Sequence, residues 1–158
     1  MNITIISVGK IKEKYFTSAI EEYSKRLSRF VKLNIIEVPD EKIPDNASEK
    51  EMNVIKKKEG EKILSRLPAN SFVITLCIEG KELSSEELAG KMSDISMTAS
   101  HITFIIGGSL GLCGTVKSKS QLRLSFGRMT LPHQLMRVVL LEQIYRTFKI
   151  NNNESYHK

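Results

Sequence analysis

The stretch Phe104-Ile105-Ile106-Gly107-Gly108-Ser109-Leu110-Gly111 decides the fold of this chain, because a buried strand passes directly into a loop of glycines. A second short apolar run, from Leu122 to Phe126, opens in the same way into Gly127-Arg128-Met129-Thr130-Leu131-Pro132. Glycine has no Cβ, so each loop can bring its backbone N–H groups close to a small ligand. In an open α/β sheet, ligands bind at the loops that follow the strands. The last third of the chain is therefore expected to hold a binding site.

Outward from these loops, strand-like and helix-like segments alternate along the whole chain. Strands are predicted over 2–8, 31–38, 71–78, 101–106 and 121–126, with Glu79-Gly80-Lys81 as a turn. Helices are predicted over 13–29 and 132–150. Two more are predicted to begin at capping boxes: one at Ser48 and Glu51, ending at about residue 67, and one at Ser84 and Glu87, ending at about residue 97. This alternation predicts an α/β fold, with a mainly parallel sheet flanked by helices, in a single domain over 1–158.

The last predicted helix is apolar around most of its circumference. Pro132 suits its first turn, and Asn151-Asn152-Asn153 ends it. Its apolar side chains are Leu135, Met136, Val138, Val139, Leu140, Leu141, Ile144, Tyr145 and Phe148. One face of a sheet cannot bury so wide an arc. We therefore predict a homodimer with this helix in the interface; the alternative is a helix buried entirely within one chain.

Composition is that of an ordinary globular chain, with 158 residues, 41% of them hydrophobic and 27% charged. The formal net charge of +6 suits a nucleic-acid partner, and a Lys-rich solvated surface is the alternative. Cys77 and Cys113 form no Cys-x-x-Cys pair, so we expect free thiols in a reducing compartment. No apolar run approaches the roughly 18 residues of a membrane span. The chain is expected to be cytoplasmic, without a membrane partner.

Several familiar catalytic motifs are absent from the sequence. There is no P-loop, no Gly-x-Gly-x-x-Gly after a strand and no nucleophile elbow. His101, His133 and His157 lack metal-ligand spacing, so no metal is expected. Two candidates for a functional site remain: the two glycine loops and the C-terminal Tyr156-His157-Lys158. The alternative interpretation of the glycine loops is that they are only tight turns. An aromatic ring, an imidazole and an ammonium suit stacking a base, moving a proton and meeting a phosphate, although such ends are often frayed.

One further set of motifs matches these loops and the C-terminal end in order and spacing. It comprises Ile106-Gly107-Gly108-x-x-Gly111, Leu124-Ser125, Thr130-x-Pro132-His133-Gln134-x-x-Arg137, Glu142-Gln143-x-Tyr145-Arg146 and Tyr156-His157. Over its whole length the chain resembles the bacterial 23S ribosomal RNA pseudouridine-N3 methyltransferase family. The resemblance implies a SPOUT fold with a C-terminal trefoil knot, and a homodimer with its active site at the interface. It implies S-adenosylmethionine as methyl donor, leaving as S-adenosylhomocysteine, and a pseudouridine in helix 69 of 23S rRNA on the assembled ribosome as substrate.

Side-chain chemistry indicates roles in proton transfer and RNA binding, and the cofactor contacts follow from the resemblance. The cofactor contacts that it implies are Leu76, Gly108, Gly127, Arg128, Met129, Thr130, Leu131 and Pro132. His157 is the first candidate for the proton acceptor, His133 the second, and a proton lost to solvent without a dedicated base is the third possibility. Tyr156 is expected to stack on the target base, and Arg137 to meet phosphates unless it is ion-paired with Glu142.

Two further features of the sequence bear on the C-terminal end and on the basic surface. Ser155 stands where the family often has proline, so the approach of the C-terminal end to the site is less rigid. The same basic surface also suits a non-catalytic, ribosome-associated RNA-binding module.

Overall fold

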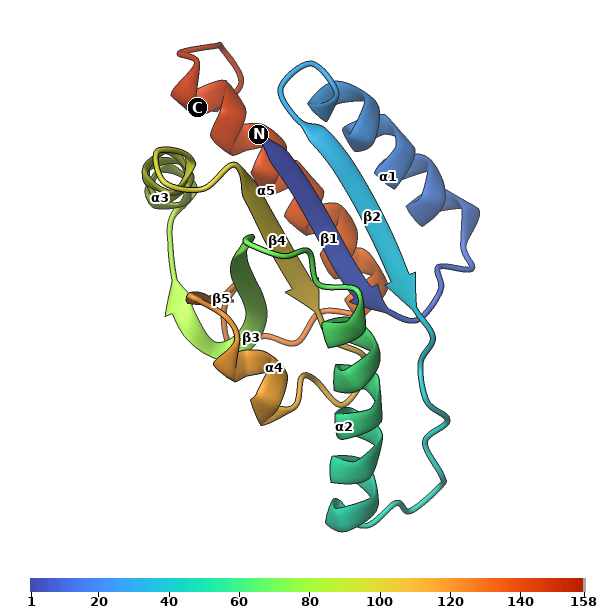
Figure 1. Cartoon of the computed structure of the whole chain (residues 1–158). Helices are drawn as coiled ribbons and strands as arrows, with labels where there is room; N and C mark the ends of the chain where they lie inside the picture. Colours follow the sequence, from blue (N-terminus) through green and yellow to red (C-terminus); the bar gives the residue numbers. More distant parts are fainter. Residues whose placement is uncertain (158) are drawn as a thin grey trace.

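The computed structural model describes residues 1–157, and its centre is a five-stranded sheet in which neighbouring strands are all parallel (Figure 1). The strands are β1 (Asn2–Val8), β2 (Lys32–Val38), β3 (Phe72–Glu82), β4 (His101–Ile106) and β5 (Leu122–Ser125), in the spatial order β2-β1-β4-β3-β5. Central strands of a parallel sheet are covered on both faces, which explains the continuous apolar runs in β1 and β4. The predicted α/β fold with a parallel sheet is confirmed.

Helices cover both faces of the sheet. One face carries α1 (Lys14–Leu27), α3 (Ser85–Ser96) and α5 (His133–Asn151), and the other carries α2 (Glu49–Ser65) and α4 (Gly114–Ser118). Side chains alternate along β1, so Ile3 and Ile5 pack toward α1 and α5 while Ile6 and Val8 pack toward α2 and α4. The core is thus divided by the sheet into two apolar layers.

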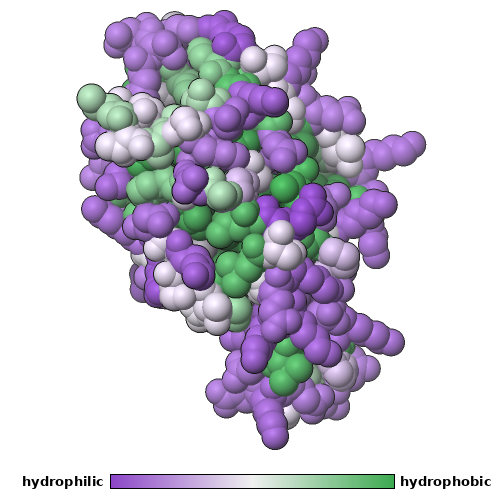
Figure 2. Space-filling model, viewed as in Figure 1, coloured by the Kyte–Doolittle hydropathy of each residue, from purple (hydrophilic) through white to green (hydrophobic). Residues whose placement is uncertain are grey.

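Both predicted capping boxes are present. The Ser48 and Ser84 hydroxyls each accept the backbone N–H three residues on, at 3.1 Å, and the Glu at that position returns a hydrogen bond to the cap backbone. Each box satisfies N–H groups that the first helical turn leaves without partners. The amino-terminal half of α2 projects from the body with a largely hydrophilic surface (Figures 1 and 2).

The predicted turn at Glu79-Gly80-Lys81 is wrong, because β3 continues through it to Glu82. Leu76 and Lys81 both pair with Leu124 of β5, so the intervening residues form an irregularity within the strand. A Cβ on Gly80 would lie 2.8 Å from the carbonyl carbon of Arg123. The missing side chain therefore lets the two backbones approach where the strand bends.

Two smaller features also differ from expectation. The five-residue α4 was not predicted, because it is short and its cap residue Cys113 makes no side-chain cap hydrogen bond. Pro132 is the N-cap of α5 with extended backbone (φ −54°, ψ 133°), so the helix begins at His133. The end of α5 agrees with the prediction, since Asn152 is the C-cap and Asn153 has φ 54°.

The long helix α5 is buried along one side only. Leu140, Leu141 and Ile144 are fully buried against the sheet. On the opposite side, Leu135, Val138 and Val139 remain partly exposed. The apolar arc that is too wide for one sheet face is therefore present, and residues 1–157 leave part of it partly exposed.

Two expectations from composition can be compared with the structure. Cys77 and Cys113 are free thiols, as predicted. Over residues 1–157, no helix combines the length and the apolar character that crossing a membrane requires.

The contact between Gly80 and β5 gives a stability prediction. Gly80→Ala places a methyl group against backbone that cannot move aside, and we expect a loss of about 1–3 kcal/mol in the free energy of unfolding. Urea unfolding followed by far-UV circular dichroism measures it. The control is Gly90→Ala in α3, where a Cβ meets nothing within 4 Å and should stabilise by about 0.5–1 kcal/mol. Equal midpoints for the two variants would contradict the prediction.

Candidate functional site

A cleft of about 400 Å³ opens between the distal part of β3 and the loops that follow β4 and β5. Six of the eight residues proposed from sequence as cofactor contacts line it, namely Leu76, Gly108, Gly127, Met129, Thr130 and Leu131. Arg128 and Pro132 lie in the same loop but are not among the lining residues. The two glycine loops, about twenty residues apart in sequence, are thus brought to one cavity.

The loop after β4 is held tightly by its glycines. The Gly111 N–H donates to the Gly108 carbonyl at 3.0 Å, and Gly111 has φ +83°. A Cβ on Gly107 would lie 2.8 Å from the carbonyl carbon of Gly111. Since L side chains rarely adopt such φ values and the turn leaves no room for a Cβ, the backbone shape at the cleft depends on these glycines.

The loop after β5 is fixed in a similar way. Gly127 has φ +115°, and its N–H donates to the Ser125 hydroxyl at 3.1 Å. Phe126, Met129 and Leu131, all more than a third exposed, surround this turn. The second loop therefore presents apolar side chains around a constrained backbone.

Beneath the first loop lies a floor of buried side chains. A Cβ on Gly108 would stand 3.1 Å from the Val8 side chain and 3.4 Å from Oε1 of Glu59. Glu59 is 5% exposed, its Oε2 accepts the Glu41 N–H at 3.0 Å, and burial raises the pKa of its carboxyl. The end of β1 and the middle of α2 thus support the loop from below.

The cleft also contains residues that the sequence analysis did not assign to the cofactor. They include Lys56, Cys77, Ile78, Glu79, Lys117 and Met136, together with His133, which the sequence analysis gave as a candidate proton acceptor. Lys117 is ion-paired with Glu79 across the cleft wall. Their positions depend on how α2, β3 and α4 pack, which no local pattern specifies.

His133 is the first residue of α5 and is half-buried in the wall of the cleft. Burial lowers the pKa of its imidazole, the Arg137 cation one turn further along lowers it again, and Asp40 opposes the shift. The ring is therefore neutral at physiological pH and has a lone pair to offer.

Arg137 lies inside the molecule, with 2% of its surface exposed. Its Nη1 donates to Glu37 at 2.7 Å, and its Nη2 donates to the carbonyls of Val8 and Gly9 at 2.9 and 2.7 Å. Glu142 pairs instead with Arg146, at 2.6 Å. In this structure Arg137 joins α5 to the ends of β1 and β2, and its guanidinium does not face solvent where a phosphate would approach.

The C-terminal segment packs on its own chain. The Tyr156 hydroxyl donates to Oε1 of Glu142 at 3.1 Å, and its ring lies edge-on to Tyr145, with 5.0 Å between ring centroids. The Arg146 guanidinium lies 4.7 Å over the same ring. Burial and the neighbouring Glu142 carboxylate raise the pKa of the Tyr156 phenol to about 12.

Both ring nitrogens of His157 are also engaged. Nε2 lies 2.6 Å from Glu86 of α3, and Nδ1 lies 3.1 Å from Arg146. Neither Tyr156 nor His157 lines the cleft. Their contacts begin at Glu142, about 14 Å along the helix axis from His133. Lys158, the third member of the expected group, lies outside the described residues.

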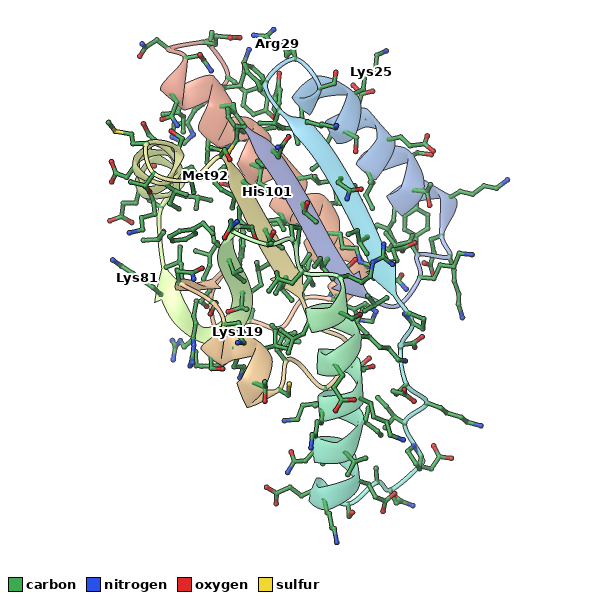
Figure 3. All side chains as sticks on the ribbon, in the orientation of Figure 1. Lys25, Arg29, Lys81, Met92, His101 and Lys119 are labelled. Carbon is green, nitrogen blue, oxygen red and sulfur yellow. The ribbon has the colours of Figure 1, made fainter. Side chains whose placement is uncertain are left out.

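The tail is further anchored at the far end of α5. Glu154 is ion-paired with Arg29 and Lys149. Figure 3 shows Arg29 beside the C-terminal end, whereas His101 stands at the start of β4. Among residues 1–157 no group of three His, Cys, Asp or Glu side chains is arranged to hold a metal ion.

Comparisons with known proteins agree with this architecture. A family model described as a predicted SPOUT methyltransferase matches residues 1–157. The chain is 60% identical to the ribosomal RNA large subunit methyltransferase H of Clostridioides difficile, over the full length of both chains, and 60% identical to that of Clostridium novyi over the same extent. Among solved structures, the tRNA (m1G37) methyltransferase of Aquifex aeolicus superposes with a TM-score of 0.55 at 13% identity, covering 92% of this chain and 70% of that one.

The buried position of Arg137 gives a second stability prediction. Arg137→Met leaves the Val8 and Gly9 carbonyls without this donor, and Glu37, whose side chain is 37% exposed, loses its cation but keeps contact with water. Leaving buried carbonyls without a donor costs about 1–3 kcal/mol. Arg26→Met, which removes an exposed pair with Glu22, is the matched control and should cost no more than about 1 kcal/mol. Chemical denaturation of both variants measures the difference, and similar losses would show that Arg137 has no special structural role.

Proposed function

The chain belongs to the SPOUT methyltransferases and, within them, to the ribosomal RNA large subunit methyltransferase H family, and we propose that it methylates N3 of a pseudouridine in helix 69 of 23S rRNA. Family membership makes the chain an enzyme, so a non-catalytic RNA-binding module is not retained. The observation that carries the finer proposal is the single cleft formed by both glycine loops. The assembled ribosome in the cytoplasm is the proposed site of action.

S-adenosylmethionine is the proposed methyl donor; it supplies an electrophilic methyl group on a sulfonium and leaves as the neutral thioether S-adenosylhomocysteine. The cleft fits it in size, since ligand sites typically enclose about 300–1,000 Å³. Leu76, Met129 and Leu131 provide apolar walls for the adenine. Because Gly108 and Gly127 carry no Cβ, the adenine can come close to the backbone of both loops and contact those polar groups that the turns leave unbonded.

The chain's own contribution to the rate lies mainly in placement. Holding two reacting groups in line and in contact is worth up to about 7–11 kcal/mol of the activation barrier. Loops fixed by the Gly108–Gly111 turn and the Ser125–Gly127 hydrogen bond suit that task, because they lose little freedom when a ligand binds. Arg137 takes part in this proposal as a positioning residue beneath the loops rather than as a phosphate contact.

A homodimer explains how the tail reaches a cleft that it does not line in its own chain. Leu135, Val138 and Val139 form a partly exposed stripe on α5, and Glu142 and Arg146, which hold the tail, continue the same stripe at helical spacing. Two such stripes packed antiparallel about a two-fold axis place the tail end of each α5 against the cleft end of the other. We propose that Tyr156 and His157 complete the partner's site in this way, with Tyr156 stacking on the target base.

The path of the chain supports a trefoil knot of the SPOUT type. β5 is the edge strand beside β3, yet α5 crosses back to pack between α1 and α3 beneath the middle of the sheet. The loop from Phe126 to Pro132 must therefore return past the loop that follows β4. We propose that the chain threads through at this crossing, so that the knot itself forms the cofactor cleft.

The first test measures methyl transfer directly. Leu131→Glu puts a charge into the apolar wall of the cleft, and we expect S-adenosylmethionine binding by calorimetry to weaken about tenfold or more, since burying an unpaired charge is costly. Transfer of label from S-adenosylmethionine to ribosomes lacking the modification should fall with it. The matched control is Met97→Glu, because Met97 is 84% exposed and remote from the cleft. Label at any position other than N3 of pseudouridine would overturn the proposal.

A second test asks whether the site is shared between subunits. At an S-adenosylmethionine concentration too low to saturate the Leu131→Glu cleft, a Leu131→Glu chain and a chain carrying both Tyr156→Ala and His157→Ala should each have little activity alone. Mixed under conditions that exchange subunits, they should regain about a quarter of wild-type activity, because each heterodimer has one site with an intact cleft and an intact tail. If each tail served its own cleft, no mixture would recover activity, and light scattering would confirm that exchange had occurred.

A further inference from the structure

The three histidines of the chain differ in what their rings contact. His101 Nε2 is hydrogen-bonded to Thr4 at 2.8 Å, and both nitrogens of His157 are occupied by Glu86 and Arg146. Within residues 1–157, the His133 ring makes no hydrogen bond, and it alone of the three lines the cleft. One imidazole is therefore free to bond a group that enters this site.

His133 is also held firmly in the wall of the cleft. It is fixed at the start of α5, beside Met136 and facing the loop from Gly107 to Leu112 in the same cavity. Burial of Arg137 one turn later anchors this end of the helix to β1 and β2. A residue on a helix that is fixed in this way keeps its position better than one on a terminal segment.

The charged groups around His133 favour its neutral form. After burial, Arg137 on the same helix is the next cause that lowers the pKa of His133, and Asp40, in the segment after β2, acts against it. Lys56 of α2 and the Lys117–Glu79 pair line the same cavity. A half-buried imidazole next to a guanidinium holds its lone pair available at neutral pH, which is the state that a proton acceptor needs.

We propose that His133, rather than the tail histidine, accepts the proton that the target nitrogen loses on methylation. The inference rests on the proposed methyl transfer to N3. As the N3–C bond forms, the N3–H bond breaks and its proton passes to the free ring nitrogen of His133, while the electron pair of the broken C–S bond stays on sulfur. The imidazolium then releases the proton to water, and the neutral ring is restored.

A titration of the free protein tests the electrostatic part without any substrate. Histidine ring NMR signals should give His133 a pKa below the ordinary value of about 6.5. Asp40→Asn removes the anion that raises this pKa, so the midpoint should fall further. Asp45→Asn, at an exposed position of the same segment, is the matched control and should leave the midpoint in place. A His133 midpoint that ignores Asp40→Asn would contradict the placement of these groups.

Single-turnover methylation tests the catalytic part. The wild-type rate should rise with pH until His133 is deprotonated and then level off. Asp40→Asn should move this rising limb of the pH–rate profile to lower pH. His133→Gln should keep S-adenosylmethionine binding by calorimetry, lose about 10²–10⁴-fold in rate, and show no limb. His101→Gln is the control outside the cleft.

The outcomes separate the possible failures. A His133→Gln enzyme that keeps both its rate and its limb overturns the proposal, and a limb removed by His157→Gln instead assigns the proton to the tail. A wild-type protein that binds S-adenosylmethionine but labels no ribosome refutes the proposed function itself. Should His133→Gln fail to bind cofactor, the shift of the limb in Asp40→Asn decides alone, because an unmoved limb excludes His133.

Discussion

The buried guanidinium of Arg137 is the interaction on which the site depends. Removing a cation from water is costly, and burial lowers the pKa of this group accordingly. Glu37 and the carbonyls of Val8 and Gly9 offset that cost, and these partners lie at the carboxyl ends of β1 and β2. The start of α5 is therefore fixed relative to two strands that are far away in sequence. The Val8 side chain also lies against Gly108, so the Arg137 guanidinium fixes the position of α5 relative to the first glycine loop of the cleft.

The same cation has an electrostatic effect on the cleft. Arg137 and His133 are one helical turn apart, so they face the same side of α5. Burial is the main cause that lowers the pKa of His133, the guanidinium lowers this pKa further, and Asp40 opposes the shift. Structural support and tuning of a titratable group thus come from one residue. A replacement of Arg137 that restored only the packing would therefore change the electrostatic potential at His133.

Local chemistry explains which parts of the fold the sequence could predict. The runs at 2–8 and 101–106, the boxes at Ser48 and Ser84 and the asparagines after Ile150 act over a few residues, and the structure has them where they were predicted. Gly80 was misjudged because its close neighbour is Arg123, more than forty residues away. For the same reason Glu37 could not be recognised as the partner of Arg137. Glu142 is five residues from Arg137 but four from Arg146, so helical spacing favours the Glu142–Arg146 pair that the structure has. The glycine loops were visible in the sequence, but Lys56 and Lys117 reach the cleft only through the packing of α2 and α4.

Helix α5 connects the two ends of the proposed reaction site. Its first residue lines the cleft, and the tail that follows its last turn folds back onto Glu142 and Arg146. In a helix of 19 residues, about 28 Å long, the tail contacts stay far from the cleft of the same chain. In the proposed homodimer, a two-fold axis across the exposed stripe removes that separation without moving the tail from its anchors. The proposed dimer then presents the cofactor on one subunit and an aromatic platform on the other, so that dimerisation itself forms the surface that meets the nucleotide.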